Sequence, residues 1–168
     1  EGLLRHFTAV ADAAAVPVCL YNVPGRTACN MRPETVLRLA AHPNIIGIKE
    51  SSGDLAQVQH LLLGRPEGFA VLSGEDWMTL AVIAAGGDGL VSVASNEVPR
   101  LMSRLVHHSL QGRLPEAREI LYTVLPLLEA NFLETNPAPA KAALAAMGKI
   151  QDILRLPLVP LSASKRAP

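Results

Sequence analysis

Two short apolar runs decide the fold that this sequence predicts. The first reads Val16-Pro17-Val18-Cys19-Leu20-Tyr21-Asn22, and the second reads Asn44-Ile45-Ile46-Gly47-Ile48-Lys49-Glu50. A turn signature at residues 23–25 and a helix-like segment join them. We interpret the two runs as neighbouring parallel strands, each of which ends in polar residues.

Side chains alternate along a strand, so the pattern assigns each residue to a face of the sheet. Lys49 shares its face with Ile45 and Gly47, and Gly47 is expected to leave room for the lysine side chain. Tyr21 shares its face with Cys19. The residues expected to pack against covering helices point the other way: Val18, Leu20, Ile46 and Ile48. Tyr21 and Lys49 should then converge near the carboxyl ends of the strands, where α/β folds place their sites.

The lysine at the end of the second run is the first candidate for chemistry. Burial disfavours the charged form of a lysine, and a neutral amine is the nucleophile that forms a Schiff base with a carbonyl group. This favours Lys49 as a nucleophile. The alternative is a lysine that begins a loop and extends its amine to water.

Strand-like and helix-like segments alternate four times along the first part of the chain, which is typical of βαβ units. The expected strands are 16–22, 44–50, 69–74 and 90–93. The expected helices are 1–15, 33–41, 54–63, 77–85, 97–111, 115–132 and 139–147, followed by an extended segment 154–160 and a polar tail 162–168. The glycine-rich loop 86–89 precedes a strand, so it is not the phosphate loop of a nucleotide site. We therefore predict an α/β fold in which residues 1–112 form half of a (βα)8 barrel, with a helical extension and extended tail over residues 113–168.

Composition excludes several classes of partner. The chain has 168 residues, 49% of them apolar, and a formal net charge of zero, so nothing suggests a nucleic acid or an anionic membrane as partner. No apolar stretch is long enough to span a bilayer. Cys19 and Cys29 are interpreted as free structural thiols in a reducing cytoplasm. His107 and His108 are adjacent on a helix and do not share a face, so no metal site is expected. The first residue is not methionine, and we expect an incomplete chain.

Several motifs, in order and with ordinary spacing, resemble the dihydrodipicolinate synthase family, which includes N-acetylneuraminate lyase and related pyruvate-dependent aldolases. The matching segments are 21–27, 45–54, 72–76, 86–93, 134–141 and 154–161. The resemblance implies a TIM (βα)8 barrel with a C-terminal helical extension, of which this chain supplies the C-terminal half. It also implies that this fragment alone is inactive, because the family's first four strands and their keto-acid-binding loop lie outside it.

The resemblance gives five residues a role. Lys49 would be the lysine that forms an imine with pyruvate, and Tyr21 would relay protons. Arg26 would bind the carboxylate of the second substrate, for which a guanidinium is suited by its paired donors. Gly74 and Val91 would line the pocket, Val91 through its backbone carbonyl. The alternatives are a surface arginine at 26, a packed strand tyrosine at 21 and an ordinary turn glycine at 74.

The reaction that the resemblance implies is the condensation of pyruvate with aspartate semialdehyde to hydroxytetrahydrodipicolinate, in the diaminopimelate and lysine pathway. It needs no cofactor or metal, and family membership suggests a cytoplasmic homotetramer. Arg26 favours this synthase branch over the sugar-acid lyases. Two departures from the family are Ala28, where glycine is commoner, and Ser51, where alanine is commoner. Two other functions compete: another pyruvate-dependent aldolase of the superfamily, and a non-catalytic half-barrel that serves as an assembly module.

Overall fold

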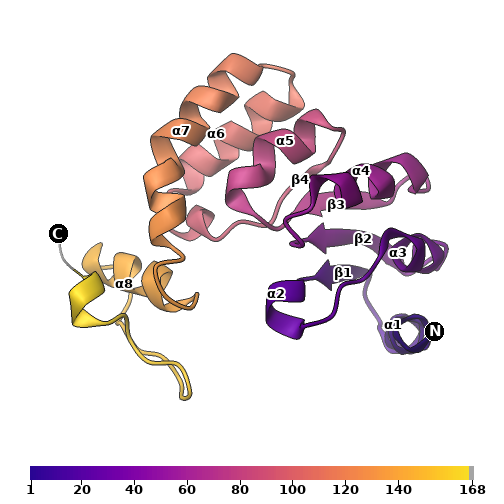
Figure 1. Cartoon of the computed structure of the whole chain (residues 1–168), viewed down its shortest axis with the longest axis horizontal. Helices are drawn as coiled ribbons and strands as arrows, with labels where there is room; N and C mark the ends of the chain where they lie inside the picture. The colour runs from indigo at the N-terminus through magenta and orange to yellow at the C-terminus, as the bar shows by residue number, and fades with distance from the viewer. Residues whose placement is uncertain (167–168) are drawn as a thin grey trace. The chain divides into compact units, whose positions relative to one another are not determined.

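Four parallel strands form one sheet in the order β1-β2-β3-β4 in the computed structural model, which describes residues 1–166. The strands are parallel throughout, and Figure 1 shows the arrows of β1 and β2 pointing the same way, with α2 beyond the head of β1. The strands are β1 (Val18–Asn22), β2 (Ile45–Glu50), β3 (Ala70–Ser73) and β4 (Gly89–Leu90). The predicted parallel sheet with intervening helices is therefore confirmed.

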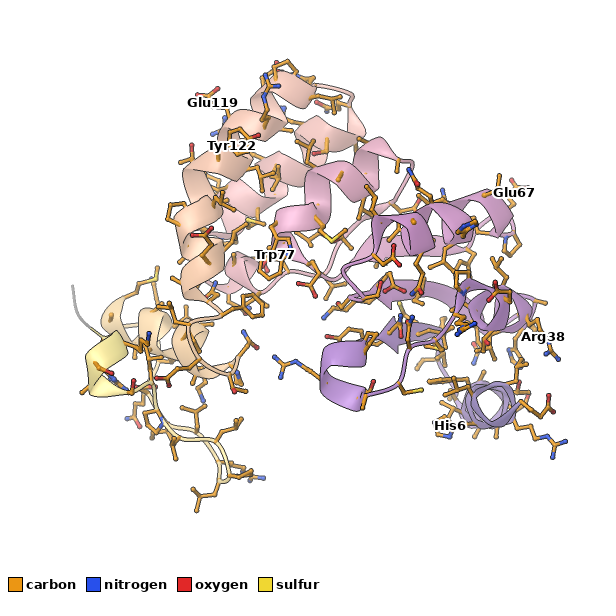
Figure 2. The ribbon with its side chains drawn as sticks, in the orientation of Figure 1. His6, Arg38, Glu67, Trp77, Glu119 and Tyr122 are labelled. Carbon is orange, nitrogen blue, oxygen red and sulfur yellow. The ribbon has the colours of Figure 1, made fainter. Side chains whose placement is uncertain are left out.

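Five α-helices belong to the same compact unit, residues 1–91. They are α1 (Gly2–Ala13), α2 (Pro24–Thr27), α3 (Pro33–Leu39), α4 (Leu55–Gly64) and α5 (Thr79–Ala84). Proline opens α2 and α3, where its missing N–H is tolerated. Asp54 caps α4, because its carboxylate accepts hydrogen bonds from the N–H groups of residues 56 and 57 at 2.9 and 3.1 Å. His6 and Arg38 lie on the outer surfaces of α1 and α3, away from the sheet (Figure 2).

The core of this unit is formed where helices cover one face of the sheet. Leu20 of β1, Ile48 of β2 and Val71 of β3 are almost completely buried, with 1% or less of each side chain exposed. Helix residues Val36, Leu39, Val58 and Leu61 belong to the same apolar cluster. Burying an aliphatic side chain of this size contributes about 1.5–3 kcal/mol, so this layer holds the strands in register.

A second compact unit begins at Ser92; its regular elements among the described residues are helices, and a segment without helix or strand covers residues 151–162. Its helices are α6 (Pro99–Leu110), α7 (Leu114–Ala130) and α8 (Ala138–Ala146). Its 3₁₀ turns are η2 (Ala94–Asn96) and η3 (Ala163–Lys165). α6 packs against α7 through buried residues that include Met102, Leu105, Ala117 and Leu128. Glu119 and Tyr122 project outward from α7 (Figure 2). Residues 167–168 of the predicted polar tail lie outside the described residues, and the predicted division after residue 112 stays a prediction.

The face prediction for β2 is wrong at its first two residues. Ile45 is buried, with 3% exposed, whereas Ile46 is 48% exposed. The reason is an irregularity in the β1–β2 ladder: Val18 pairs with Ile45, but Cys19 pairs with Gly47, so Ile46 is an extra residue. A bulge of this kind reverses the alternation on one side of it. The alternation from Gly47 onward follows the prediction.

Two other expectations about the strands are corrected. β4 ends at Leu90 instead of residue 93, although the Val91 N–H continues the ladder with a 2.9 Å hydrogen bond to the Ser73 carbonyl. Gly47 does not serve mainly to make room for Lys49. A Cβ atom at position 47 would lie 2.7 Å from the carbonyl oxygen of Ala70, so this glycine lets β3 approach β2.

Across residues 1–166, none of the helices combines the length and the apolar character that crossing a lipid bilayer requires.

The two outer strands of the sheet generate a prediction for the isolated 168-residue chain. β1 and β4 each pair with a single strand among the described residues, and Tyr21, Ile46 and Val91 are between 41% and 48% exposed. Unpaired strand edges beside apolar surface promote association. We expect sedimentation velocity to show oligomers that increase with concentration. A single monomeric species at all concentrations would contradict this.

Candidate active site

Lys49 and Tyr21 lie side by side at the carboxyl ends of β2 and β1. They are paired residues in the ladder, and the Lys49 Nζ atom is 4.1 Å from the centroid of the Tyr21 ring. A cation over an aromatic ring is attracted by about 0.5–2 kcal/mol, depending on its exposure to water. Lys49 is half-buried and Tyr21 is 44% exposed, so the amine is held but still reachable. The structure therefore brings together the two residues predicted to be catalytic.

Gly74 lies directly beside the Lys49 side chain, at the end of β3. Its N–H donates a 2.8 Å hydrogen bond to the carbonyl oxygen of Glu50. A Cβ atom at position 74 would lie 1.8 Å from Ser51 Oγ, 3.0 Å from Lys49 Cε and 3.1 Å from the Glu50 carbonyl oxygen. The absence of a side chain at Gly74 therefore makes the space that Ser51 and Lys49 occupy.

Arg26 and Lys49 both act on a carboxyl group that the sequence did not single out. Arg26 is an exposed residue of α2, and Glu75 is a half-buried residue that follows Gly74. Burial raises the pKa of the Glu75 carboxyl, and the negative charge of Asp76 raises it further. The positive charges of Lys49 and Arg26 oppose this increase. Lys49, Arg26 and Glu75 thus belong to one electrostatic cluster.

Val91, the last residue predicted for the pocket, continues the ladder beyond β4 at the level of Ser73. It is 41% exposed. Its position at the carboxyl end of the sheet fits the prediction, and the role of its carbonyl group stays a prediction.

Cys19 is a further side chain near Lys49 of a type that can act as a nucleophile. Its thiol reaches solvent, yet the surrounding atoms raise its pKa by desolvation. A hydrogen bond from the backbone of Lys49 and the charge of Lys49 partly oppose this increase. A raised pKa keeps the thiol in its less reactive protonated form at neutral pH, so Cys19 is a poor competitor for an electrophile.

A polar network on the other face of the sheet was missed by reasoning from sequence. Asn22 and Glu50 follow Tyr21 and Lys49 and pair with each other in the ladder. Both are buried, with 2% and 4% exposed, and hydrogen bonds join their side chains. The available signal was a carboxylate placed by alternation on the helix-covered side of a strand, where it requires partners.

Among residues 1–166, the structure holds no group of three or more His, Cys, Asp or Glu side chains placed to bind a metal ion.

A parallel sheet with intervening helices, with a lysine and a tyrosine converging at its carboxyl edge, defines the class: an α/β protein with a candidate site where the strands end. The model of the dihydrodipicolinate synthetase family matches residues 1–168, and the chain belongs to this family.

Known relatives agree with this assignment. The chain is 55% identical over 168 residues to a 4-hydroxy-tetrahydrodipicolinate synthase of Acidobacterium capsulatum, covering 99% of this chain and 56% of that protein. The dihydrodipicolinate synthase of Aquifex aeolicus is 37% identical with a TM-score of 0.96, covering 98% of this chain and 57% of its own. The dihydrodipicolinate synthase of Acinetobacter baumannii, solved in complex with pyruvate, is 38% identical with a TM-score of 0.95. The match covers 99% of this chain and 57% of that one. The chain thus spans about half the length of the curated relatives it matches.

The space at Gly74 generates a prediction. In Gly74→Ala the new methyl group must displace the Ser51 hydroxyl and crowd Lys49, so we expect a loss of about 1–3 kcal/mol in the free energy of unfolding. Urea denaturation of the full-length protein measures it. Adding Ser51→Ala should recover part of the loss, because it removes the shortest contact. Gly2→Ala is the control, since nothing lies within 4 Å of a Cβ there. Unchanged stability in Gly74→Ala would contradict the packing role.

Proposed function

We propose that the full-length protein containing this chain is a Schiff-base-forming synthase that condenses pyruvate with aspartate semialdehyde to 4-hydroxy-tetrahydrodipicolinate. The observation that carries the proposal is the Lys49 amine, held 4.1 Å from the Tyr21 ring at the carboxyl edge of a parallel sheet. Family membership and the names of the relatives support it. In this proposal the sheet is the C-terminal half of a (βα)8 barrel, and the isolated chain is inactive.

Each step uses an atom of the described site. The Lys49 amine attacks the keto carbon of pyruvate, and the keto oxygen leaves as water to give an iminium ion. Loss of a methyl proton, which Tyr21 relays, gives an enamine. The enamine carbon attacks the aldehyde carbon, and the aldehyde oxygen takes up a proton through Tyr21. The amino group of the product then attacks the iminium carbon, which closes the ring and releases Lys49.

Arg26 supplies selectivity for the second substrate in this proposal. It is exposed on α2, within electrostatic range of Glu75 at the end of β3. A guanidinium binds a carboxylate through two parallel hydrogen bonds, which an aldehyde without a carboxylate cannot accept. The proposal includes a cytoplasmic homotetramer, as the family resemblance suggests, and neither a metal nor an organic cofactor takes part.

The imine prediction tests the proposal. Full-length protein incubated with pyruvate and sodium borohydride should carry a stable adduct on the peptide that contains Lys49. Lys49→Ala should abolish the adduct, and Lys49→Arg should do no better, because a guanidinium remains protonated. Lys149→Ala, at an exposed lysine of the second unit, is the matched control and should still be modified. A stable adduct on a different lysine of the wild-type protein would disprove the assignment.

The second substrate gives a separate prediction. Arg26→Ala should reduce kcat/KM for aspartate semialdehyde by roughly ten- to a hundredfold, because a hydrogen bond to a charged group contributes about 1.5–3 kcal/mol. Formation of the pyruvate adduct should persist. Arg32→Ala removes another exposed arginine just before α3, and it should change neither quantity. If Arg26→Ala blocks the adduct and leaves the KM for the aldehyde unchanged, the role of Arg26 is misassigned.

A further inference from the structure

A buried carboxylate lies directly behind the Lys49–Tyr21 pair. In the β1–β2 ladder Tyr21 pairs with Lys49, and the next residues, Asn22 and Glu50, pair with each other. Alternation sends the first pair to one face of the sheet and the second pair to the other. Glu50 is 4% exposed and Asn22 is 2% exposed. The groups that hold Glu50 are therefore coupled through the backbone to the residues proposed to act on pyruvate.

Three neutral donors surround the Glu50 carboxylate. Its two oxygens accept hydrogen bonds from Asn22 Nδ2 at 3.1 and 3.0 Å. The backbone N–H of Ser52 donates to it at 2.6 Å, and Gln57 Nε2 donates at 3.2 Å from α4. Hydrogen bonds offset the cost of burying a carboxylate only if both oxygens stay acceptors. The surroundings of Glu50 therefore suit a carboxylate, both of whose oxygens accept hydrogen bonds.

The network continues from Glu50 into the loop that carries Arg26. The Asn22 amide oxygen accepts a 2.9 Å hydrogen bond from the backbone N–H of Met31, and its Nδ2 also donates to Asn30 Oδ1 at 2.8 Å. Gln57 exchanges hydrogen bonds of 2.9 and 3.1 Å with Asn30. The segment 23–31 thus begins directly after Asn22, and its last residue, Met31, is hydrogen-bonded to the Asn22 side chain.

The orientation of the Asn22 amide follows from its two neighbours. The backbone N–H of Met31 can only donate, so it requires the amide oxygen. The carboxylate of Glu50 can only accept, so it requires the amide nitrogen. If one oxygen at position 50 became a donor, it would face the donors that surround Glu50, namely Asn22 Nδ2, the Ser52 N–H and Gln57 Nε2, and the anchor of the loop at Asn22 would be weakened.

We propose that Glu50 is a positioning residue: its carboxylate, acting through Asn22, anchors the loop 23–31 to the end of the strand that carries Lys49 and so sets where Arg26 lies relative to the amine. The kinetic consequence rests on the proposed function, in which Arg26 binds the carboxylate of the second substrate. The anchoring itself is independent of that function.

Glu50→Gln in the full-length protein is the test, because it keeps the shape and replaces one acceptor oxygen with a donor. Hydrogen–deuterium exchange should become faster in peptides covering residues 23–31, above all at the Met31 amide. The KM for aspartate semialdehyde should rise roughly five- to tenfold, as expected for one lost hydrogen bond, while pyruvate trapping stays within about twofold. Unchanged exchange over residues 23–31 would overturn the proposal.

Asp88→Asn is the matched control at the other end of the strands. Asp88 accepts from the Val71 N–H at 2.7 Å and from the Arg65 side chain, so the substitution also converts a bonded carboxylate to an amide. It should leave exchange over residues 23–31 unchanged. Faster exchange there in both variants would mean a general loss of stability, and it would overturn the specific role of Glu50.

A double-mutant cycle separates positioning from a purely structural effect. If Glu50 acts through Arg26, Glu50→Gln should cost far less kcat/KM in the Arg26→Ala background than in the wild type. Fully additive losses would overturn the kinetic part. If wild-type protein fails to trap pyruvate, the proposed function fails, whereas hydrogen exchange still decides whether Glu50 anchors the loop.

Asn22→Ser covers the case in which Glu50→Gln does not fold. The shorter side chain cannot reach both the Glu50 carboxylate and the Met31 N–H, whereas Glu50 keeps its hydrogen bonds from Ser52 and Gln57. It should produce the same faster exchange over residues 23–31 and the same rise in the aldehyde KM. If both quantities match the wild type, the proposal is wrong.

Discussion

The parallel pairing of β1 with β2 is the constraint on which the site depends. One register places Tyr21 opposite Lys49 and Asn22 opposite Glu50. The first pair faces the open side of the sheet, and the second faces the helices. A shift by one residue would exchange these environments and bury the lysine without partners. The apolar layer centred on Ile48 resists that shift, so the packing of the core and the geometry of the site are fixed together.

Patterns within a short stretch of sequence correctly predicted the features that neighbouring residues determine. The convergence of Tyr21 and Lys49 followed from alternation, and the start of α4 followed from the capping residue Asp54. The prediction failed at Ile46, because the extra residue in β2 exists only relative to its partner strand. The alternation of side chains along one strand does not indicate where a β-bulge interrupts its pairing with the neighbouring strand. The paired register, which is a tertiary property, decides which isoleucine is buried.

Two parts of the site could be predicted only incompletely from the sequence, because their surroundings depend on the tertiary fold. Glu50 lies on β2, and its partners include Asn22 from β1 and Gln57 from α4. Polar residues scattered in this way carry no periodicity, and only the fold collects them. Gly74 was ambiguous between a turn glycine and a pocket residue. The atoms beside it, Ser51 Oγ and Lys49 Cε, show that position 74 is closely packed, and its role in lining a pocket stays a prediction.

The charges around Lys49 also bear on the substrates in the proposed function, both of which carry a carboxylate. Lys49 and Arg26 oppose the rise in the pKa of the Glu75 carboxyl, which burial and Asp76 produce. An anion bound between the two cations would compete with Glu75 for them and add a like charge, so it would raise that pKa further. By linkage, protonation of Glu75 then favours anion binding, and its ionisation disfavours it. In the proposed function, ionisation of Glu75 as pH rises would therefore oppose the binding of an anionic substrate at this edge of the sheet.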